Sequence, residues 1–400
     1  AGCAAREPGA YDRRRVYLDA IDVVGAEVSA VLDFLERRLE LAVGGEVYGD
    51  LVDSELRDGR AAGGLVLEPA ERGNFSSGSR YLTAGAYAHL TARVWRFGDA
   101  GELRARGGAR LSAFAAAAPD VPGVGDVQIR HLGAVGSAGL QWLTPDRLSV
   151  FATWAQGLRA PNLQETTVLG DTGSKFEVPN GDLGPERSDT LELGVRLRAA
   201  PLELFAAGFT SFLEDAIDER PAEWRGATEV EGAPVIRRVN AARGRFTGVE
   251  GSAALRVWRL TVGGGAAWMR GTYTDASGES HPARRVPPVE GTARLRYDRP
   301  DGRLYAALVG RFAARQDRLH PSDAQDLRIC EDGFHTGALR DPCDGTAGYA
   351  VLDLRAGARL FDAARLHLVL ENLTDARYKQ HGSGFYLPGF GVRVGLTVER

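Results

Sequence analysis

Polar and apolar residues alternate with a period of two along most of this chain. The clearest case is 365–372, where three leucines fall on one face of an extended strand and charged or polar side chains fall on the other. The same alternation recurs at three further places, 103–111, 191–198 and 390–399. Successive side chains of a strand point to opposite faces, so this pattern predicts strands rather than helices. We therefore expect an all-β chain.

The predicted strands are long, and the connections between them alternate in size. Strands of about 10 to 15 residues can cross a bilayer at a tilt. Short turns at 98–101, 144–146, 300–302 and 361–364 alternate with longer polar stretches. Unpaired strand edges are costly in lipid, so a sheet of this kind must close. The pattern predicts a transmembrane antiparallel β-barrel with short periplasmic turns and long extracellular loops.

A soluble β-sandwich is the alternative fold for an alternating chain. Its strands also alternate, but a sandwich gives no reason for such long strands or for loops of systematically unequal length. The barrel is therefore the favoured interpretation, and a soluble β protein with an interaction role stays open as an alternative.

About fifteen strands are expected from the alternation. They lie near 16–34, 35–53, 80–95, 102–115, 129–143, 147–158, 187–199, 201–213, 245–257, 259–273, 288–298, 303–313, 349–360, 365–373 and 390–399. A bacterial single-chain barrel with both ends in the periplasm needs an even number of strands. The odd count, together with Met269 as the only methionine, predicts that residues 1–400 are part of a longer protein.

Composition narrows the functional classes. The chain is 44% hydrophobic and 26% charged, which is ordinary for a folded protein. A formal net charge of -4 with scattered Lys and Arg predicts no nucleic-acid partner. No apolar run reaches the roughly 18 residues of a membrane helix. The sequence carries no nucleophile-base-acid set, phosphate-binding loop or zinc-spaced Cys/His set, so we expect no enzyme, no cofactor and no metal site.

Three cysteines occur, and two of them, Cys330 and Cys343, share one polar stretch rich in Gly and Pro. A loop-closing disulfide in an oxidising compartment is the favoured reading, with free thiols as the alternative. Cys3 is left over. The Ala-Gly-Cys sequence around it is like a lipoprotein acylation site, but no apolar segment precedes it, so a loop cysteine is expected.

Two short boxes follow one another in the middle of the chain. Residues 158–161 read Leu-Arg-Ala-Pro, and residues 179–186 read Pro-Asn-Gly-Asp-Leu-Gly-Pro-Glu. With small substitutions they resemble the signature boxes of TonB-dependent receptors, in which a strand ends in Phe-Arg-Ala-Pro and the next opens after Asn-Pro-Asn-Leu and Pro-Glu. Residues 371–378 with 388–389 look like the last outer loop of these receptors, and 245–250 and 286–288 look like other strand openings.

The resemblance covers most of 145–400 and implies a function as well as a fold. It implies a barrel of about 22 strands whose lumen holds an N-terminal plug, of which this chain would hold about strands eight to twenty-two, without the plug. It also implies an outer-membrane receptor in a Gram-negative bacterium, surrounded by lipid and energised by the inner-membrane TonB protein. Such a receptor takes up a scarce nutrient, and a ferric siderophore or similar organic chelate is the expected ligand.

The box residues are expected to have structural roles. Polar side chains near strand ends can satisfy backbone groups where a long loop leaves a sheet, and prolines stop strands from extending. The residues of this set are Arg159, Pro161, Asn162, Asn180, Leu183, Pro185, Glu186, Asn372, Leu373, Pro388 and Gly389. Arginines on the polar face of the strands are expected to meet water or a polar plug. They are Arg104, Arg106, Arg110, Arg294, Arg355 and Arg359.

Ligand contacts are expected in the outer loops, where cations and aromatic rings suit an anionic, partly aromatic chelate. The candidates are Lys175, Phe176, Trp224, Arg225, His281, Arg284, Arg285, His320, His335, His381 and Tyr386. A haem receptor of this family would carry a His between the two boxes, and none occurs from 162 to 178. A passive porin-like barrel, or one for sugars or peptides, remains the alternative; it would share the alternation but not the boxes.

Overall fold

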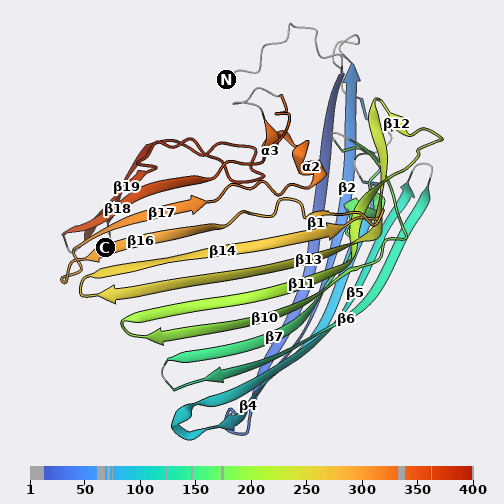
Figure 1. Cartoon of the computed structure of the whole chain (residues 1–400). Helices are drawn as coiled ribbons and strands as arrows, with labels where there is room; N and C mark the ends of the chain where they lie inside the picture. Colours follow the sequence, from blue (N-terminus) through green and yellow to red (C-terminus); the bar gives the residue numbers. More distant parts are fainter. Residues whose placement is uncertain are drawn as a thin grey trace.

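The computed structural model describes residues 13–60, 68–69, 73, 75–121, 124–145, 147–172, 175–331, 338–361 and 363–398. Over these residues the chain forms one curved sheet of fifteen long strands that follow one another in chain order (Figure 1). The prediction of an all-β antiparallel fold is confirmed. No helix in the described ranges is both long enough and apolar enough to span a membrane.

The elements have the following bounds. The long strands are β1 (Arg13–Phe34), β2 (Leu39–Arg60), β4 (Ser79–Arg96), β5 (Glu102–Val121), β6 (Gly125–Leu143), β7 (Leu148–Arg159), β10 (Glu186–Ala199), β11 (Leu202–Pro221), β13 (Ala233–Val257), β14 (Leu260–Thr274), β16 (Glu290–Asp298), β17 (Leu304–Ala313), β18 (Tyr349–Phe361), β19 (Ala364–Glu371) and β20 (Gly391–Val398). Short strands in the connections are β3 (Glu68–Pro69), β8 (Gly170–Asp171), β9 (Phe176–Val178), β12 (Glu229–Val230) and β15 (Ser280–Pro282). The helices are η2 (Gly98–Ala100), α1 (Leu163–Thr167), α2 (Pro321–Ala324) and α3 (Leu327–Cys330).

Each long strand pairs antiparallel with the long strand that follows it, from β1–β2 to β19–β20. The short β9 departs from this pattern, because it runs parallel to the outer part of β13, with Phe176 opposite Val235. Within the described ranges no backbone pairing joins β1 to β20. These two strands are therefore the edges of the sheet.

The connections separate into two kinds by the end of the sheet at which they lie. At one end, the turn end, they are short: 35–38, 97–101, 144–147, 200–201, 258–259, 299–303 and 362–363. At the other end, the loop end, most are long: 61–78, 160–185, 222–232, 275–289, 314–348 and 372–390. The predicted asymmetry between short turns and long loops is confirmed.

Two hairpins extend further at the loop end than the sequence suggested. The strands expected at 102–115 and 129–143 instead reach Val121 and begin at Gly125, and those expected at 201–213 and 245–257 are also longer. The first extension is stabilised because its small side chains are buried. Val121 and Val127 pack in one cluster with Val52 and with Leu163 of α1. This cluster is an apolar core at the loop end of the sheet.

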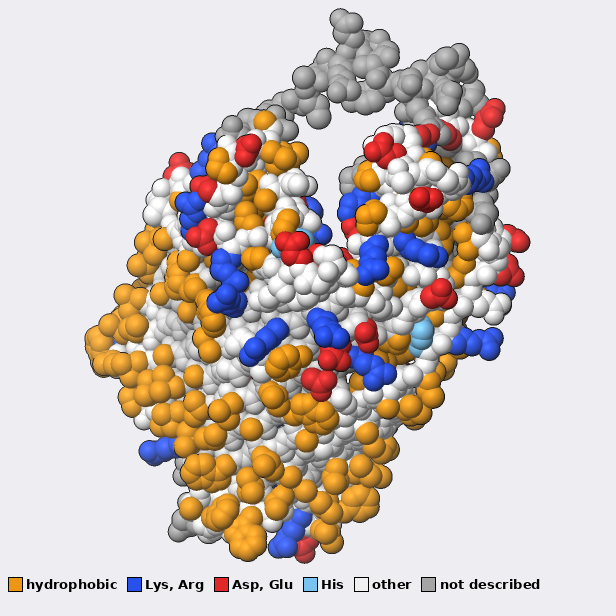
Figure 2. Space-filling view, turned by 45° about the vertical axis from the view of Figure 1, so that its right-hand side comes forward, with side chains coloured by type: hydrophobic (Ala, Val, Ile, Leu, Met, Phe, Trp, Pro, Cys, Tyr) orange, Lys and Arg blue, Asp and Glu red, His pale blue; other side chains and the backbone are white. Residues whose placement is uncertain are grey.

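The two faces of the sheet differ in chemistry. Large apolar side chains on one face are open to the surroundings, including Leu132, which is 70% exposed, and Leu193, which is 63% exposed. Figure 2 shows apolar side chains over the lower part and left edge of the visible surface, whereas charged side chains gather across its middle and upper part. Alternation along β5 places Arg104, Arg106 and Arg110 on the face opposite Leu111. Arg110 reaches along this polar face to Glu46 at 2.5 Å.

Aromatic rings on the polar face occupy the space beside glycines of the neighbouring strand. A Cβ on Gly194 would lie 2.3 Å from the ring of Phe151, and one on Gly357 would lie 2.3 Å from the ring of Tyr305. A side chain at either position would displace the ring. Glycine inside these strands is therefore required for close packing rather than for a turn.

Candidate ligand-binding surface

Side-chain hydrogen bonds of the first box link the end of β7 to the start of β10. Arg159 donates from Nη1 to Glu165 at 2.8 Å and from Nε to Glu186. Glu186 also accepts a hydrogen bond from the backbone of Ile217 on β11 at 2.8 Å. Asn162 caps α1, because its side chain accepts from the Glu165 backbone while the Glu165 side chain accepts from the Asn162 backbone. These groups bind one another and so fix the place where the loop leaves the sheet.

The second box folds back against β6 and β13. The buried Asn180 donates to the Arg238 carbonyl at 2.7 Å, and Leu183 is only 1% exposed. The carbonyl of Leu183 lies 2.7 Å from Nε2 of His131. Pro185 directly precedes β10 and ends the box. His131 was not singled out from the sequence, because it lies 52 positions away from its partner.

The last outer loop is closed by Asn372, which is 1% exposed. Its amide nitrogen donates to the carbonyls of Ala376 and Pro388 at 2.8 and 3.1 Å, and its carbonyl oxygen accepts from the Ala376 backbone at 3.0 Å. The Leu373 backbone donates to Leu352 at 2.7 Å. A Cβ on Gly389 would lie 2.4 Å from a carboxylate oxygen of Asp375. The hydrogen bonds of Asn372 and Leu373 hold the two ends of the loop together, and the close approach of Asp375 leaves no room for a side chain at position 389.

The candidate ligand residues form three groups at the loop end. The first group is Lys175, Phe176, Trp224 and Arg225. Pairing of β9 with β13 brings the rings of Phe176 and Trp224 within 6.2 Å of each other. The guanidinium of Arg225 lies 5.3 Å from the Trp224 ring. Lys175 is already engaged, because it forms an ion pair with Glu219.

The second group lies where β15 and the loop 283–289 meet α2. The rings of His281 and His320 are 5.4 Å apart. His320 caps α2 by accepting from the Ser322 backbone at Nδ1, and burial lowers its pKa. Arg284 lies 3.4 Å from the buried carboxylate of Asp323. The neutral imidazole of His320 is therefore favoured, and Arg284 is the cation of this group.

Arg285 and His381 lie beside this second group. Arg285 donates from its backbone to Asp323 at 2.9 Å and from Nη2 to Asp326 at 3.2 Å. Hydrogen bonds from Arg328 lower the pKa of Asp326 to about 2. The ring nitrogen Nδ1 of His381 lies 2.9 Å from the Thr346 hydroxyl, and burial lowers the pKa of His381. These side chains mainly join neighbouring loops to one another.

The third group surrounds Tyr386. The guanidinium of Arg377 lies 4.8 Å from the Tyr386 ring, and the ammonium of Lys379 lies 5.3 Å from it. Sequence reasoning found Tyr386 but missed both cations, although their alternation along 377–379 was a usable signal. His335 falls outside the described residues.

A disulfide joins Cys330 and Cys343, whose Cα atoms are 5.4 Å apart. It closes part of the loop 314–348 beside α3. Cys3 lies outside the described residues. Among the residues that the structure describes, no three His, Cys, Asp or Glu side chains are grouped so as to hold a metal ion.

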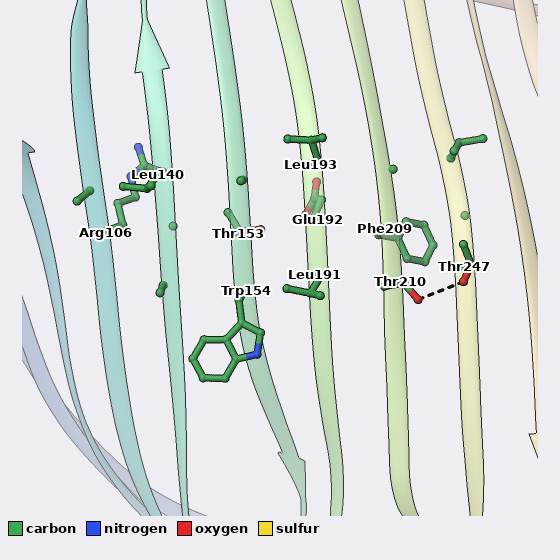
Figure 3. A pocket seen from close by; sticks show the side chains of 17 residues that line it. Arg106, Leu140, Thr153, Trp154, Leu191, Glu192, Leu193, Phe209, Thr210 and Thr247 are labelled. Carbon is green, nitrogen blue, oxygen red and sulfur yellow. Dashed lines mark hydrogen bonds between the residues drawn. The ribbon is translucent and has the colours of Figure 1, made fainter.

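A hollow of about 910 Å³ lies along β5, β6, β7, β10, β11 and β13 (Figure 3). Its lining includes Leu140, Trp154, Leu191 and Leu193, together with small residues such as Gly208. Alternation places these leucines on the apolar face. The hollow is therefore a shallow depression in the exposed apolar surface, remote from the three groups at the loop end.

The sheet is antiparallel, with one exposed apolar face, one polar face and its long loops at one end. These features define the class of β-barrel membrane proteins. The chain matches the family described as TonB dependent receptor-like, beta-barrel, over residues 6–373, and it belongs to that family. The predicted family is confirmed. TonB-dependent receptor barrels are outer-membrane proteins, and the family consists of receptors and transporters rather than enzymes.

Solved structures share this fold at low sequence identity. The copper transporter OprC is 18% identical with a TM-score of 0.74, and the match covers 96% of this chain and 57% of OprC. The FrpB iron transporter from Neisseria meningitidis (F3-3 variant) is 18% identical with a TM-score of 0.67, covering 94% of this chain and 55% of FrpB. The Serratia marcescens hemophore receptor HasR is 17% identical with a TM-score of 0.68, covering 96% and 60%. This chain thus spans between half and two thirds of each structure. No curated protein matches it.

Proposed function

We propose that this chain forms part of the wall of an outer-membrane receptor in a Gram-negative bacterium, and that the receptor takes up a ferric siderophore or similar organic chelate with energy from TonB. The family membership supports the receptor class. The chemistry of the loop end supports the ligand class. The exposed apolar face would contact lipid, and the arginines of the opposite face would meet water or a polar plug.

One observation carries the choice of ligand. The structure brings cations and aromatic rings from five separate connections into three groups at the same end of the sheet, and two of these groups place a guanidinium or ammonium over an aromatic ring. Cations beside rings favour an anion that also presents flat or apolar surface. Siderophores and related chelates have this chemistry.

Individual candidates differ in their contacts with carboxylates of the protein. Lys175 and Arg285 are already paired with carboxylates, so their contribution would be to position the loops. Trp224, Arg225 and Tyr386 offer ring and guanidinium surface, and Arg225 is exposed. We therefore assign direct contact first to the groups around Trp224 and Tyr386.

A passive porin-like barrel, or one for sugars or peptides, is the competing function. It would need neither the family boxes nor cation-aromatic groups at the loop end. A strain that lacks the gene should fail to grow under iron limitation when a particular ferric chelate, supplied alone from a panel, is its iron source, and the gene should restore growth. Equal growth with and without the gene on every chelate, combined with a defect on a sugar or peptide, would overturn the proposal.

A further inference from the structure

The hollow of about 910 Å³ on the apolar face adjoins a group of arginines that point to the same side of the sheet. One row of directly paired residues crosses the hollow, and it consists of Trp154, Leu191, Thr210 and Thr247. The hydroxyls of Thr210 and Thr247 are 3.1 Å apart (Figure 3). Thr247 is paired in turn with Arg270 on β14. Directly opposite residues of paired strands point to the same face, so Arg270 lies on the apolar face at the edge of the hollow.

Two further arginines lie on this face, nearer to the loop end. Side chains alternate along β13, so Arg243 and Arg245 point to the same side as Thr247. Arg245 is paired with Phe212 on β11, and its guanidinium lies 5.4 Å from the centre of the Phe212 ring. Arg243, Arg245 and Arg270 are all exposed. These three residues, the outer arginine group, lie where the apolar face gives way to charged side chains.

Within the described residues, no ion pair joins the outer arginine group to a carboxylate. The strand segments that carry the group are described throughout. The carboxylates at neighbouring positions of the strands and the adjoining turn are Asp189, Glu214, Asp215, Asp218, Asp275 and Glu279. Two of them are engaged elsewhere, since Asp189 accepts from Trp154 at 3.0 Å and Asp275 accepts from the Ser277 hydroxyl at 2.6 Å. The three guanidiniums therefore present their donors to the surroundings of the sheet.

Arginines on the polar face have protein partners instead. Arg110 pairs with Glu46, and Arg311 pairs with the buried Asp353. An arginine on the lipid-facing side of a barrel is costly in the middle of the bilayer but not near its surface, where headgroups meet it. The outer arginine group is therefore expected at the level of the lipid headgroups, on the side of the long loops. In barrels of this class these loops are extracellular, so the headgroups are those of the outer leaflet.

The group and the hollow together match the two parts of a phosphorylated lipid. Guanidiniums bind phosphate oxygens in a bidentate geometry, and the apolar lining of the hollow suits acyl chains. The hollow crosses six strands, which lie about 4.8 Å apart, so it is roughly 24 Å wide. A lipid with two chains would cover only part of this width. Its shape therefore favours a lipid with several acyl chains.

We infer that the hollow and the outer arginine group form a binding site for a phosphorylated, multiply acylated glycolipid of the outer leaflet, the class to which lipid A belongs. Arg245 and Arg270 bind its phosphates, and Leu191, Leu193 and Gly208 contact its acyl chains. The inference rests on the proposed contact between the apolar face and lipid. It does not depend on which nutrient the receptor takes up.

The test is equilibrium binding of diphosphorylated lipid A, in detergent, to the full receptor purified from outer membranes and freed of bound lipid. Arg245→Gln and Arg270→Gln should each weaken binding at least about tenfold, because each removes charge-assisted contacts with phosphate. The matched control is Arg130→Gln. Arg130 is exposed on β6 and points to the same side as Leu132, but it lies eight positions, roughly 26 Å, from Ala138 of the hollow. This control should bind as the wild type does.

A second variant tests the hollow without touching a charge. A Cβ on Gly208 would lie 3.6 Å from the Val249 side chain, which is an ordinary contact. Gly208→Leu should therefore fill part of the hollow without displacing the backbone. We expect it to weaken lipid A binding about tenfold, because it displaces part of an acyl chain. Heat-modifiable mobility of every variant shows that it has folded.

Lipid A without its phosphates, and phosphatidylglycerol, should each bind at least about tenfold more weakly than diphosphorylated lipid A. Equal binding of either lipid, or equal binding by the wild type and the variants at 245, 270 and 208, would overturn the inference. The same loss in Arg130→Gln as in Arg245→Gln would also overturn it, since it would show a general attraction to exposed arginines. Growth on a ferric chelate without lipid A binding would refute this site alone, whereas lipid A binding without growth on any chelate would refute only the uptake proposal.

Discussion

Asn240 and Gly184 exchange two hydrogen bonds although they lie 56 positions apart in the chain. The Gly184 backbone donates to Oδ1 of Asn240 at 2.6 Å, and Nδ2 of Asn240 donates to the Gly184 carbonyl at 2.9 Å. Nδ2 also donates to the Asp215 carbonyl at 2.8 Å. The Asn240 side chain on β13 therefore forms hydrogen bonds with the backbone of the second box, as a neighbouring strand would.

Replacing this asparagine should loosen the box. Asn240→Ala removes three hydrogen bonds, two of them to the part-buried backbone of Gly184, at a cost of about 1 to 3 kcal/mol. We expect faster proteolytic cleavage within 160–185 in the purified receptor. Gln164→Ala, an exposed position on α1 in the same connection, is the control and should leave the cleavage rate unchanged. Equal rates in both variants would show that Asn240 does not hold the box.

The two faces of β10 should respond oppositely to a charge. Leu193 is on the apolar face and Glu192 is on the polar face of the same strand. An arginine in the middle of a lipid-facing wall costs about 2 to 4 kcal/mol. Leu193→Arg should reduce the fraction of receptor with heat-modifiable mobility in outer-membrane extracts, whereas Glu192→Arg should not. If both variants assemble equally, the apolar face of β10 does not contact lipid.

The disulfide should protect its loop. Cys330 and Cys343 are 13 positions apart, and closing a loop of this length removes chain entropy worth about 3 kcal/mol from the open state. Both cysteines should resist thiol labelling until a reductant is added. The double variant Cys330→Ser with Cys343→Ser should be cleaved faster within 314–348. Labelling of both thiols without reductant would contradict the pairing.

The last outer loop should become less stable in mild acid. Burial is the main cause of the lowered pKa of His381, and the neighbouring Arg285 and Lys379 lower it further, whereas Asp323 and Asp326 oppose the shift. An exposed histidine titrates near about 6.5, so below that pH the open loop binds a proton that the closed loop does not. Stability is thus fully present above this pH and falls as the pH drops towards the lowered pKa.

Hydrogen-exchange protection of 372–390, compared between pH 7.5 and pH 5, measures this effect. Protection should fall with pH in the wild type. It should change much less in His381→Gln, which keeps a polar group beside Thr346 without a titrating ring. The same fall in both proteins would assign the pH dependence to another group.

The strands of the sheet could be predicted from the sequence because the signal for a strand is local. Alternation along a segment such as 191–198 depends only on neighbouring residues, and it placed Leu193 and Arg196 on opposite faces without knowledge of the rest of the sheet. The ends of strands were less accurate. Ala116 and Ala118 continue β5 because they are buried against residues from β2 and α1, and that contact is not visible in β5 alone.

The candidate site was predicted only in part, because its members come from separate loops. The cations and rings were found one at a time, but the proximity of Arg340 to Lys379 depends on how two loops fold over the sheet. The boxes were found by their resemblance to a family. Their partners His131 and Asn240 were missed, since register between distant strands sets those contacts.

The most direct test of the central claim is uptake of radiolabelled iron by cells that carry the receptor gene, measured with and without a functional TonB protein. With the chelate that supports growth, energised uptake predicts accumulation in the TonB-containing strain and loss of accumulation when TonB is absent. Accumulation at the same rate without TonB would contradict the claim and favour a passive barrel.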